Sequence, residues 1–273
     1  MRTPSVLPRV AKSVAAVVIV ALGVTAGSLA NATASTSPHG VKMSLAKSIP
    51  PSPVFLKQGV CGTSGPNDST ACNSTVLRAV NDARKFEPVP VLAGTFSLAA
   101  FDRLNADQQL FAIADIERTA RGLAPIAGLT AQLNYIAEQA AAKQGDPNAS
   151  LPLKLTGGGV AYIYGANFAE GVADPLGASY YWMYDDGLHS PNAQCTTSSQ
   201  SSCWGHRKNI LGDYSSTKYC PSGSAIHMVM GAADVIHGVM FSPSITEIFV
   251  NDCGALPTLD FTWQDVQKLV FGH

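Results

Sequence analysis

The chain has 273 residues and a formal net charge of −1, from 18 basic and 19 acidic side chains. Without an excess of basic residues, the composition excludes a polybasic surface for nucleic acid or anionic lipid. A chain of this length can bury one substantial core, or form one domain plus an arm.

The N-terminus predicts an export signal. Arg2, Arg9 and Lys12 precede an apolar run over residues 14–24, and small residues follow it. Such a run fits the core of a signal peptide but is shorter than the roughly 18 residues that cross a bilayer. We expect residues 1–34 to be a cleaved signal peptide, the mature protein to be secreted or held at the cell surface, and no transmembrane segment to remain. An uncleaved membrane anchor is the alternative.

All six cysteines follow this segment. An even number of cysteines in an exported chain predicts disulfides. Their spacing favours three pairs as a hypothesis: Cys61 with Cys72, Cys195 with Cys203, and Cys220 with Cys253.

The first half of the mature chain predicts an arm followed by helices. Residues 35–74 are rich in Ser, Pro, Thr and Gly, which is typical of an irregular arm. The run "VLRAVNDARKFE" (76–87) then predicts a helix that ends at "PVP". Asn105 and Gln108 predict a capping box for the next helix, which Gly122 would end. A third helix is predicted by an apolar stripe from Leu129 to Ala141.

The second half predicts one more helix and then strands. "LTGGGVAYIYGANFAEG" (155–171) contains too much glycine for a long helix. Asp174 and Pro175 predict the start of a short helix through Trp182, closed by Gly187. "AIHMVMGAADVI" (225–236) and "ITEIFVN" (245–251) are typical of strands. Helices followed by strands, without regular βαβ alternation, predict an α+β fold. We assign residues 75–255 to this domain and residues 256–273 to a C-terminal tail.

Four segments in order carry a family resemblance: "DIERTARGLAPIAGLTAQLNYIAEQAA" (115–141), "YGANFAEG" (164–171), "YYWMYDDG" (180–187) and "WGHRKNILGDY" (204–214). They resemble the motifs of the CAP/SCP superfamily of cysteine-rich secretory, antigen 5 and pathogenesis-related proteins. The first resembles its opening helices, and the second its G-E-N-I segment. "YYWMYDDG" (180–187) resembles its V-x-x-W helix, and "WGHRKNILGDY" (204–214) the G-H-R-x-N-I-L of its bacterial, actinobacterial-style branch. The resemblance implies an α-β-α sandwich, with helices on both faces of a small antiparallel sheet and a central cleft.

The resemblance also implies a cleft with two histidines and two acids, which in some members binds a divalent ion. His206 matches the second histidine, and Asp185 or Asp186 corresponds to the second acid. The first histidine belongs at or beside Ala140, and the first acid at Ala166. A transition metal needs three or four converging donors, and alanine has none. We therefore expect no metal and no other cofactor, although Glu170, His189, His227 and His237 are possible substitutes.

The remaining residues of the predicted cleft have structural and functional interpretations. His206 could be a general base with Asp185, Asp186 or Glu170 as acid or orienting group, or a buried histidine that donates to a carbonyl or to Asp185. The predicted cleft also contains Trp182, Asn167, Arg207 and Asn209. Asn167 and Asn209 are interpreted as amides that bond backbone, and Arg207 as the partner of an acid or of carbonyls. Cys203 could be a nucleophile beside His206, but a disulfide is favoured.

Three functions are compatible with these residues. The first is a secreted, non-catalytic monomer that binds a small apolar ligand or lipid, an envelope component or a protein partner through the cleft. The second is an extracellular hydrolase of cell-envelope peptide or glycan with His206 as general base. The third is a structural or adhesion role that uses the arm as a spacer. The first is the preferred hypothesis.

Overall fold

The structure is a computed structural model that describes residues 70–87, 89–92, 94, 96–188, 195, 197, 203–212, 219–237 and 243–272. These residues all belong to one unit of the chain, residues 37–273. Their helices are α2 (Thr70–Arg84), α3 (Leu98–Phe101), α4 (Ala106–Thr119), α5 (Ala131–Ala141), α6 (Pro175–Tyr184), α7 (Gly205–Leu211), α8 (Trp263–Val266) and the π-helix η1 (Gln267–Phe271). Their strands are β1 (Gly128–Leu129), β2 (Leu153–Lys154), β3 (Val160–Glu170), β4 (Ile226–Val235), β5 (Ser244–Cys253) and β6 (Phe261–Thr262).

The predicted helix starts are confirmed where capping residues marked them. Asn105 and Gln108 form a reciprocal capping box at the start of α4, and Asp174 caps α6 through the amide of Gly177. Gly122 follows α4 with a positive φ of 71°, which glycine adopts without strain. The third helix begins later than the apolar stripe predicted, because Thr130 caps it and Leu129 belongs to β1.

The strands form one sheet in the order β2-β3-β5-β4-β1-β6. The long strands β3 and β4 both pair with β5 in antiparallel fashion, while β1 pairs with β4 in parallel. The α+β class is confirmed, but the sheet is mixed rather than purely antiparallel. The long connection between β1 and β4 contains several helices, which gives the chain room to return in the same direction.

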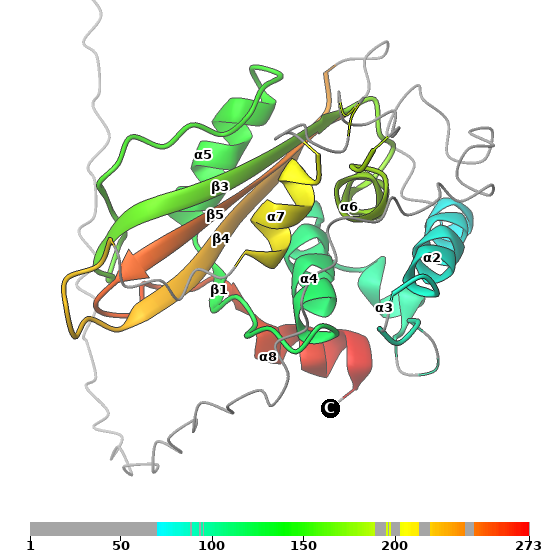
Figure 1. Cartoon of the computed structure of the whole chain (residues 1–273), viewed down its shortest axis with the longest axis horizontal. Coiled ribbons are helices and arrows are strands. Elements are labelled where there is room, and N and C mark those ends of the chain that lie inside the picture. The colour runs from blue at the N-terminus through cyan, green and yellow to red at the C-terminus, as the bar shows by residue number, and fades with distance from the viewer. Residues whose placement is uncertain are drawn as a thin grey trace, which may run out of the picture. The chain divides into compact units, whose positions relative to one another are not determined.

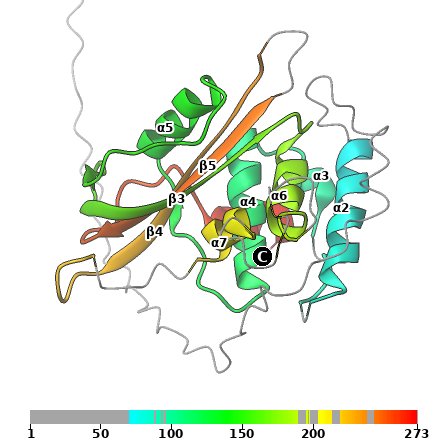
Figure 2. The same cartoon turned by 45° about the horizontal axis from the view of Figure 1, so that its top comes forward.

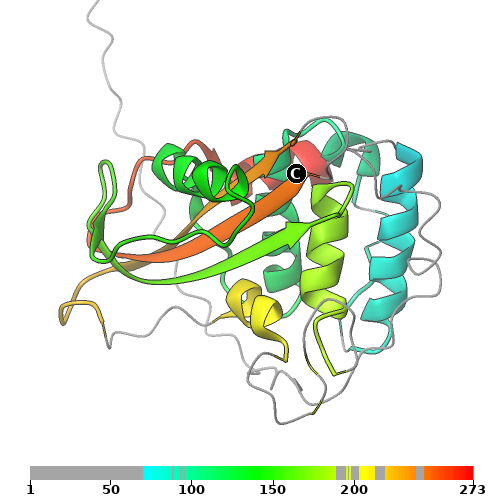
Figure 3. The same cartoon turned by 90° about the horizontal axis from the view of Figure 1, so that it is seen from above.

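Helices cover both faces of the sheet (Figures 1 and 3). Helix α5 packs on one face and buries the smaller core, which includes Leu133, Ala137, Ile248 and Val250. Helices α4, α6 and α7 lie on the other face over the larger core. Helix α2 packs against α6 and is therefore outside the layer that touches the sheet (Figure 2). This arrangement is an α-β-α sandwich, as the resemblance implied.

Two segments differ from their expected structure. Strand β3 lies in the glycine-rich stretch, where no strand was predicted, because its small residues hide the alternation that marks a strand. The segment assigned to a C-terminal tail forms β6, α8 and η1. Phe261, Val266 and Val270 are buried there in the larger core, so residues 261–271 are part of the folded domain. Helix α2 likewise starts within the predicted arm, at Thr70.

Two of the predicted disulfides are present, Cys195–Cys203 and Cys220–Cys253. The third pair involves Cys61, which lies outside the described residues. Within the described part of the chain, none of the helices is long and apolar enough to span a membrane.

Close packing of α5 on β4 predicts that Gly231 tolerates no side chain. A Cβ at this position would lie 2.1 Å from the carbonyl carbon of Leu133. We expect Gly231→Ala to lower the free energy of unfolding by about 2 kcal/mol, since helix and strand must move apart. Urea denaturation measures the change. Gly145→Ala is the control, because a Cβ there meets nothing within 4 Å; equal effects of the two substitutions would refute the explanation.

Candidate functional site

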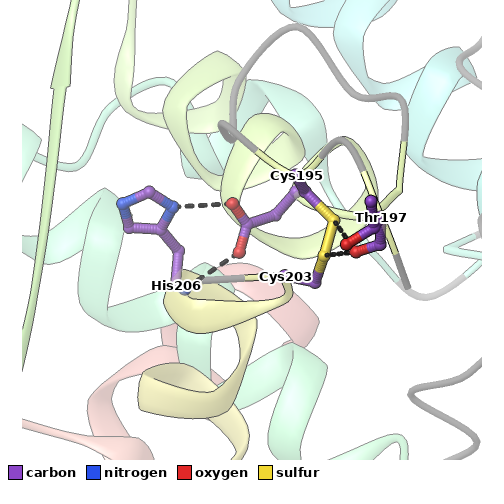
Figure 4. The surroundings of a disulfide bond; sticks show 5 residues. Cys195, Thr197, Cys203 and His206 are labelled. Carbon is purple, nitrogen blue, oxygen red and sulfur yellow. Dashed lines mark hydrogen bonds and ion pairs between the residues drawn. A yellow bond between two sulfur atoms is a disulfide. The ribbon is translucent and has the colours of Figure 1, made fainter. Parts of the chain in front are cut away.

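His206 and Asp186 form a close pair between α6 and α7. The ring Nδ1 of His206 lies 2.9 Å from Oδ1 of Asp186, and the backbone N–H of His206 donates to Oδ2 at 2.9 Å. Asp186 is fully buried, whereas 29% of the His206 side chain is exposed. The two dashed lines from His206 in Figure 4 mark these contacts. A buried carboxylate therefore fixes an imidazole that remains accessible on one side.

Asp186 also provides the cap that α7 otherwise lacks. The N-cap residue of α7 is Trp204, whose side chain makes no capping hydrogen bond and whose φ is 63°. Its backbone N–H donates to the carbonyl of Asp186 at 2.8 Å. Because the first N–H groups of a helix have no partner within it, a carboxylate placed there is stabilising. The same contacts that start α7 therefore orient His206.

Gly187 makes room for this junction. A Cβ on Gly187 would lie 2.2 Å from Cζ2 of Trp204, so the indole packs directly on the chain after Asp186. The sequence suggested Gly187 as a helix terminator. In the structure, the lack of a side chain at Gly187 also allows the indole of Trp204 to pack against the backbone there.

The Cys195–Cys203 disulfide lies just before this junction. Cys195 and Cys203 are buried, with 2% and 7% of their surfaces exposed, and Trp204 packs with them. Figure 4 shows the disulfide beside Thr197, whose carbonyl oxygen lies 3.3 Å from Cys203 Sγ. Cys203 is therefore bonded and buried, which argues against its interpretation as a nucleophile.

The contact with Asp186 is compatible with a tautomer of His206 in which Nδ1 donates to the carboxylate. In that tautomer Nε2 keeps its lone pair. An imidazole held in this way can accept a proton or bind a ligand at Nε2.

A buried amide network anchors α7 to the sheet. Asn167 in β3 donates from Nδ2 to Glu247 Oε1 at 2.6 Å and to the carbonyl of His206 at 3.2 Å. Asn209 donates to Asn167 Oδ1 and to the carbonyl of Ala166, both at 2.8 Å. Two amides thus hold two turns of α7 against β3, in agreement with their interpretation as residues that bond backbone.

Glu247 is the residue of this network that the sequence analysis missed. It lies in β5 with 1% of its surface exposed, and desolvation raises its pKa to about 8 despite the hydrogen bond from Asn167. The signal was available, since Glu247 is the only charged residue in the apolar run "ITEIFVN".

Three further residues of the predicted site are Trp182, Asp185 and Glu170. Trp182 is fully buried and donates from Nε1 to the carbonyl of Phe168 at 3.3 Å, while its ring centroid lies 6.4 Å from that of His206. Asp185 is buried at the C-cap of α6. Asp186, not Asp185, is therefore the partner of His206. Glu170 is exposed at the end of β3 and accepts from Gln144 at 3.0 Å.

The sheet separates two positions that the resemblance places in one cleft. Ala140 is in α5, on one face of the sheet, whereas His206 is in α7 on the other (Figure 1). Among the described residues there is no group of three or more His, Cys, Asp or Glu side chains that could hold a metal ion. His227 and His237 contact the carbonyls of Gly254 and Ala141, and His189 lies outside the described residues.

A second polar cluster is centred on Glu117, a fully buried residue of α4. Glu117 pairs with Arg84 at 3.0 Å and Arg121 at 2.5 Å, and it accepts from the Tyr184 hydroxyl at 2.7 Å. Burial alone would raise the pKa of Glu117, but the two guanidinium groups lower it to about 2. Glu117 is therefore ionised in the folded protein.

Arg207 joins this cluster to the helix of His206. It pairs with Glu87, which also pairs with Arg121 at 2.5 Å. Arg207 further donates to the carbonyl of Met183 at 2.7 Å and stacks over Trp204, 5.4 Å from the ring centroid. This matches the interpretation of Arg207 as the partner of an acid and a carbonyl.

An apolar groove of about 430 Å³ opens beside the same cluster. The end of α4, residues 90–92 and the C-terminal segment α8–η1 surround it. Its apolar wall includes Val91, Leu92, Phe96, Ile116, Trp263 and Phe271, and its polar lining residues are Arg84, Thr119 and Gln267. This groove was not predicted from the sequence, because Trp263 and Phe271 were assigned to a tail. The aromatic residues of "FTWQDVQKLVF" were the available signal.

Comparison of the chain with protein-family models gave no match, and neither did comparisons with curated proteins and with solved structures.

The burial of Glu247 predicts a specific pH dependence of stability. The folded state keeps this carboxyl protonated up to about pH 8, whereas the unfolded chain releases the proton near its ordinary pKa of 4.5. Between these values the folded state binds more protons, so the free energy of unfolding falls as pH rises. Glu247→Gln has no proton to lose. As pH rises through this window, we expect the free energy of unfolding of Glu247→Gln to fall less steeply than that of the wild type. The two slopes should differ by roughly 1.4 kcal/mol per pH unit.

Urea denaturation between pH 5 and 8 measures this difference. Glu170→Gln is the matched control, because Glu170 is an exposed acid near the end of the neighbouring strand. Parallel pH curves for the wild type and Glu247→Gln would contradict the assignment of the buried proton to Glu247.

Proposed function

We propose that the chain is a secreted CAP/SCP-like domain that binds a small apolar ligand and catalyses no reaction. The α-β-α layering and the two disulfides support this proposal, since both fit an exported protein of that kind. The groove beside α4 is the observation that carries the binding role. Its volume of about 430 Å³ and its mostly apolar lining with a few polar groups are typical of small-molecule sites.

The non-catalytic part of the proposal rests on what the expected cleft residues do. Asn167, Trp182 and Arg207 are buried and make hydrogen bonds within the protein. Side chains used in this way brace α7 and α6 rather than contact a substrate. The groove, in contrast, has a solvent opening and is lined by aromatic rings that a ligand can cover.

Binding of an uncharged fluorescent probe tests the groove. We expect N-phenyl-1-naphthylamine to bind the full chain, and Phe271→Ala to weaken binding about tenfold through the loss of apolar contact area. Leu269→Ala is the matched control, because Leu269 is 49% exposed in the same π-helix and does not line the groove. Equal weakening by both substitutions, or no binding at all, would argue against the groove as a ligand site.

The second candidate is an extracellular hydrolase, which the His206–Asp186 pair favours. A buried carboxylate on Nδ1 and a lone pair on Nε2 are the arrangement of a general base. Envelope peptides or glycans would be its substrates.

Hydrolysis assays decide between the two candidates. If His206 is a base, His206→Gln abolishes hydrolysis of cell-wall material or casein, and the rate follows a bell-shaped pH profile. His237→Gln is the control, since His237 contacts only the carbonyl of Ala141 among the contacts described. No hydrolysis by the wild type would eliminate the hydrolase.

A further inference from the structure

The polar cluster beside the groove carries more positive than negative charge. Its linked side chains are three guanidinium groups, Arg84, Arg121 and Arg207, and two carboxylates, Glu87 and Glu117. Arg121 and Arg207 share Glu87, and Arg84 and Arg121 share Glu117. The linked set therefore has one positive charge in excess.

Tyr184 does not supply the missing negative charge. Its hydroxyl donates to Glu117 at 2.7 Å, and burial raises its pKa above the ordinary value of 10. A neutral phenol therefore occupies the centre of the cluster. The centroid of its ring lies 6.0 Å from the guanidinium carbon of Arg121 and 5.9 Å from that of Arg207. Cation–π attraction to the ring stabilises these positive charges but does not neutralise them.

Arg84, which pairs with Glu117, connects this cluster to the groove. It is fully buried, and its Nη1 donates at 2.8 Å to the carbonyl of Pro90, another residue of the groove lining. Among the described lining residues Arg84 is the only charged one. Buried charge in a low-dielectric surrounding is weakly screened, so an anion at the Pro90 end of the groove is attracted even without touching the guanidinium.

We propose that the ligand of this groove is an amphipathic monoanion, with an apolar body along Trp263 and Phe271 and a single negative head group at the Arg84–Pro90 end. This inference rests on the proposed binding function and adds the charge of the ligand. The charge excess of the cluster, the presence of Arg84 in the groove lining and the apolar residues of that lining carry the inference. A neutral apolar ligand would fill the wall but leave the excess charge uncompensated.

A pair of ligands with the same tail tests the charge. Dodecanoate and dodecan-1-ol, both below their aggregation limits, compete with the neutral fluorescent probe for the full chain at pH 7.5 and low salt. We expect dodecanoate to bind about tenfold more tightly than dodecan-1-ol, as an ionic attraction across a partly desolvated site implies.

One variant changes the cluster charge without touching the groove wall. Glu87→Gln raises the excess from one positive charge to two, and we expect it to increase the preference for dodecanoate severalfold. Asp82→Asn makes the same change of net charge at an exposed position, where Asp82 pairs with Lys85, and should leave the preference as in the wild type.

The outcomes separate this inference from the proposed function. Preference for dodecanoate that rises in Glu87→Gln but not in Asp82→Asn supports the inference. Binding of dodecan-1-ol at least as tight as that of dodecanoate overturns the inference and leaves the apolar site in place. Failure of the probe and both ligands to bind overturns the proposed function together with the inference. The wild-type comparison is decisive by itself if Glu87→Gln is too unstable to assay.

Discussion

The ionisation of Glu117 inside the helical layer is the constraint on which much of this structure depends. A buried carboxylate is costly unless opposite charges and hydrogen bonds surround it. Arg84 from α2, Arg121 after α4 and Tyr184 from α6 provide them. Three segments far apart in sequence must therefore meet at one point. Removal of any one partner would leave a buried charge incompletely paired, which is far more destabilising than the loss of a surface ion pair.

Arg207 connects the cluster around Glu117 to the region of His206, because it pairs with Glu87, which also pairs with Arg121. The position of α7 is fixed on one side by Arg207 and on the other by Asn167 and Asn209. The seven residues of α7 are too few to form a stable helix alone. Its stability must come from these contacts and from the carboxylate of Asp186 at its start. His206 is therefore held in place by Asp186 and by the contacts that Arg207, Asn167 and Asn209 make with α7.

Local signals made much of the fold predictable, whereas the site depended on contacts over long sequence separations. The Asn105 capping box, the Asp174 cap and the strand patterns of β4 and β5 are local and were identified. The partnership of Asp186 with His206 was one of several possibilities, because cap geometry after α6 decides which of two adjacent acids points at α7. Glu247 and the groove were missed. The role of Glu247 depends on its pairing with Asn167 of the neighbouring strand. The role of Trp263 and Phe271 depends on the C-terminal segment folding back beside α4.

The groove and His206 lie at two ends of one continuous set of contacts. Pro90 accepts from Arg84, Arg84 and Arg121 share Glu117, and Arg121 and Arg207 share Glu87. Contiguity alone does not couple two sites, since coupling needs an element with two arrangements that both sites bias. Dense pairing around Glu117 favours a single arrangement of this set. The cluster is best understood as a rigid brace that borders the groove at one end and positions α7 at the other, and it provides no basis for coupling between the groove and His206.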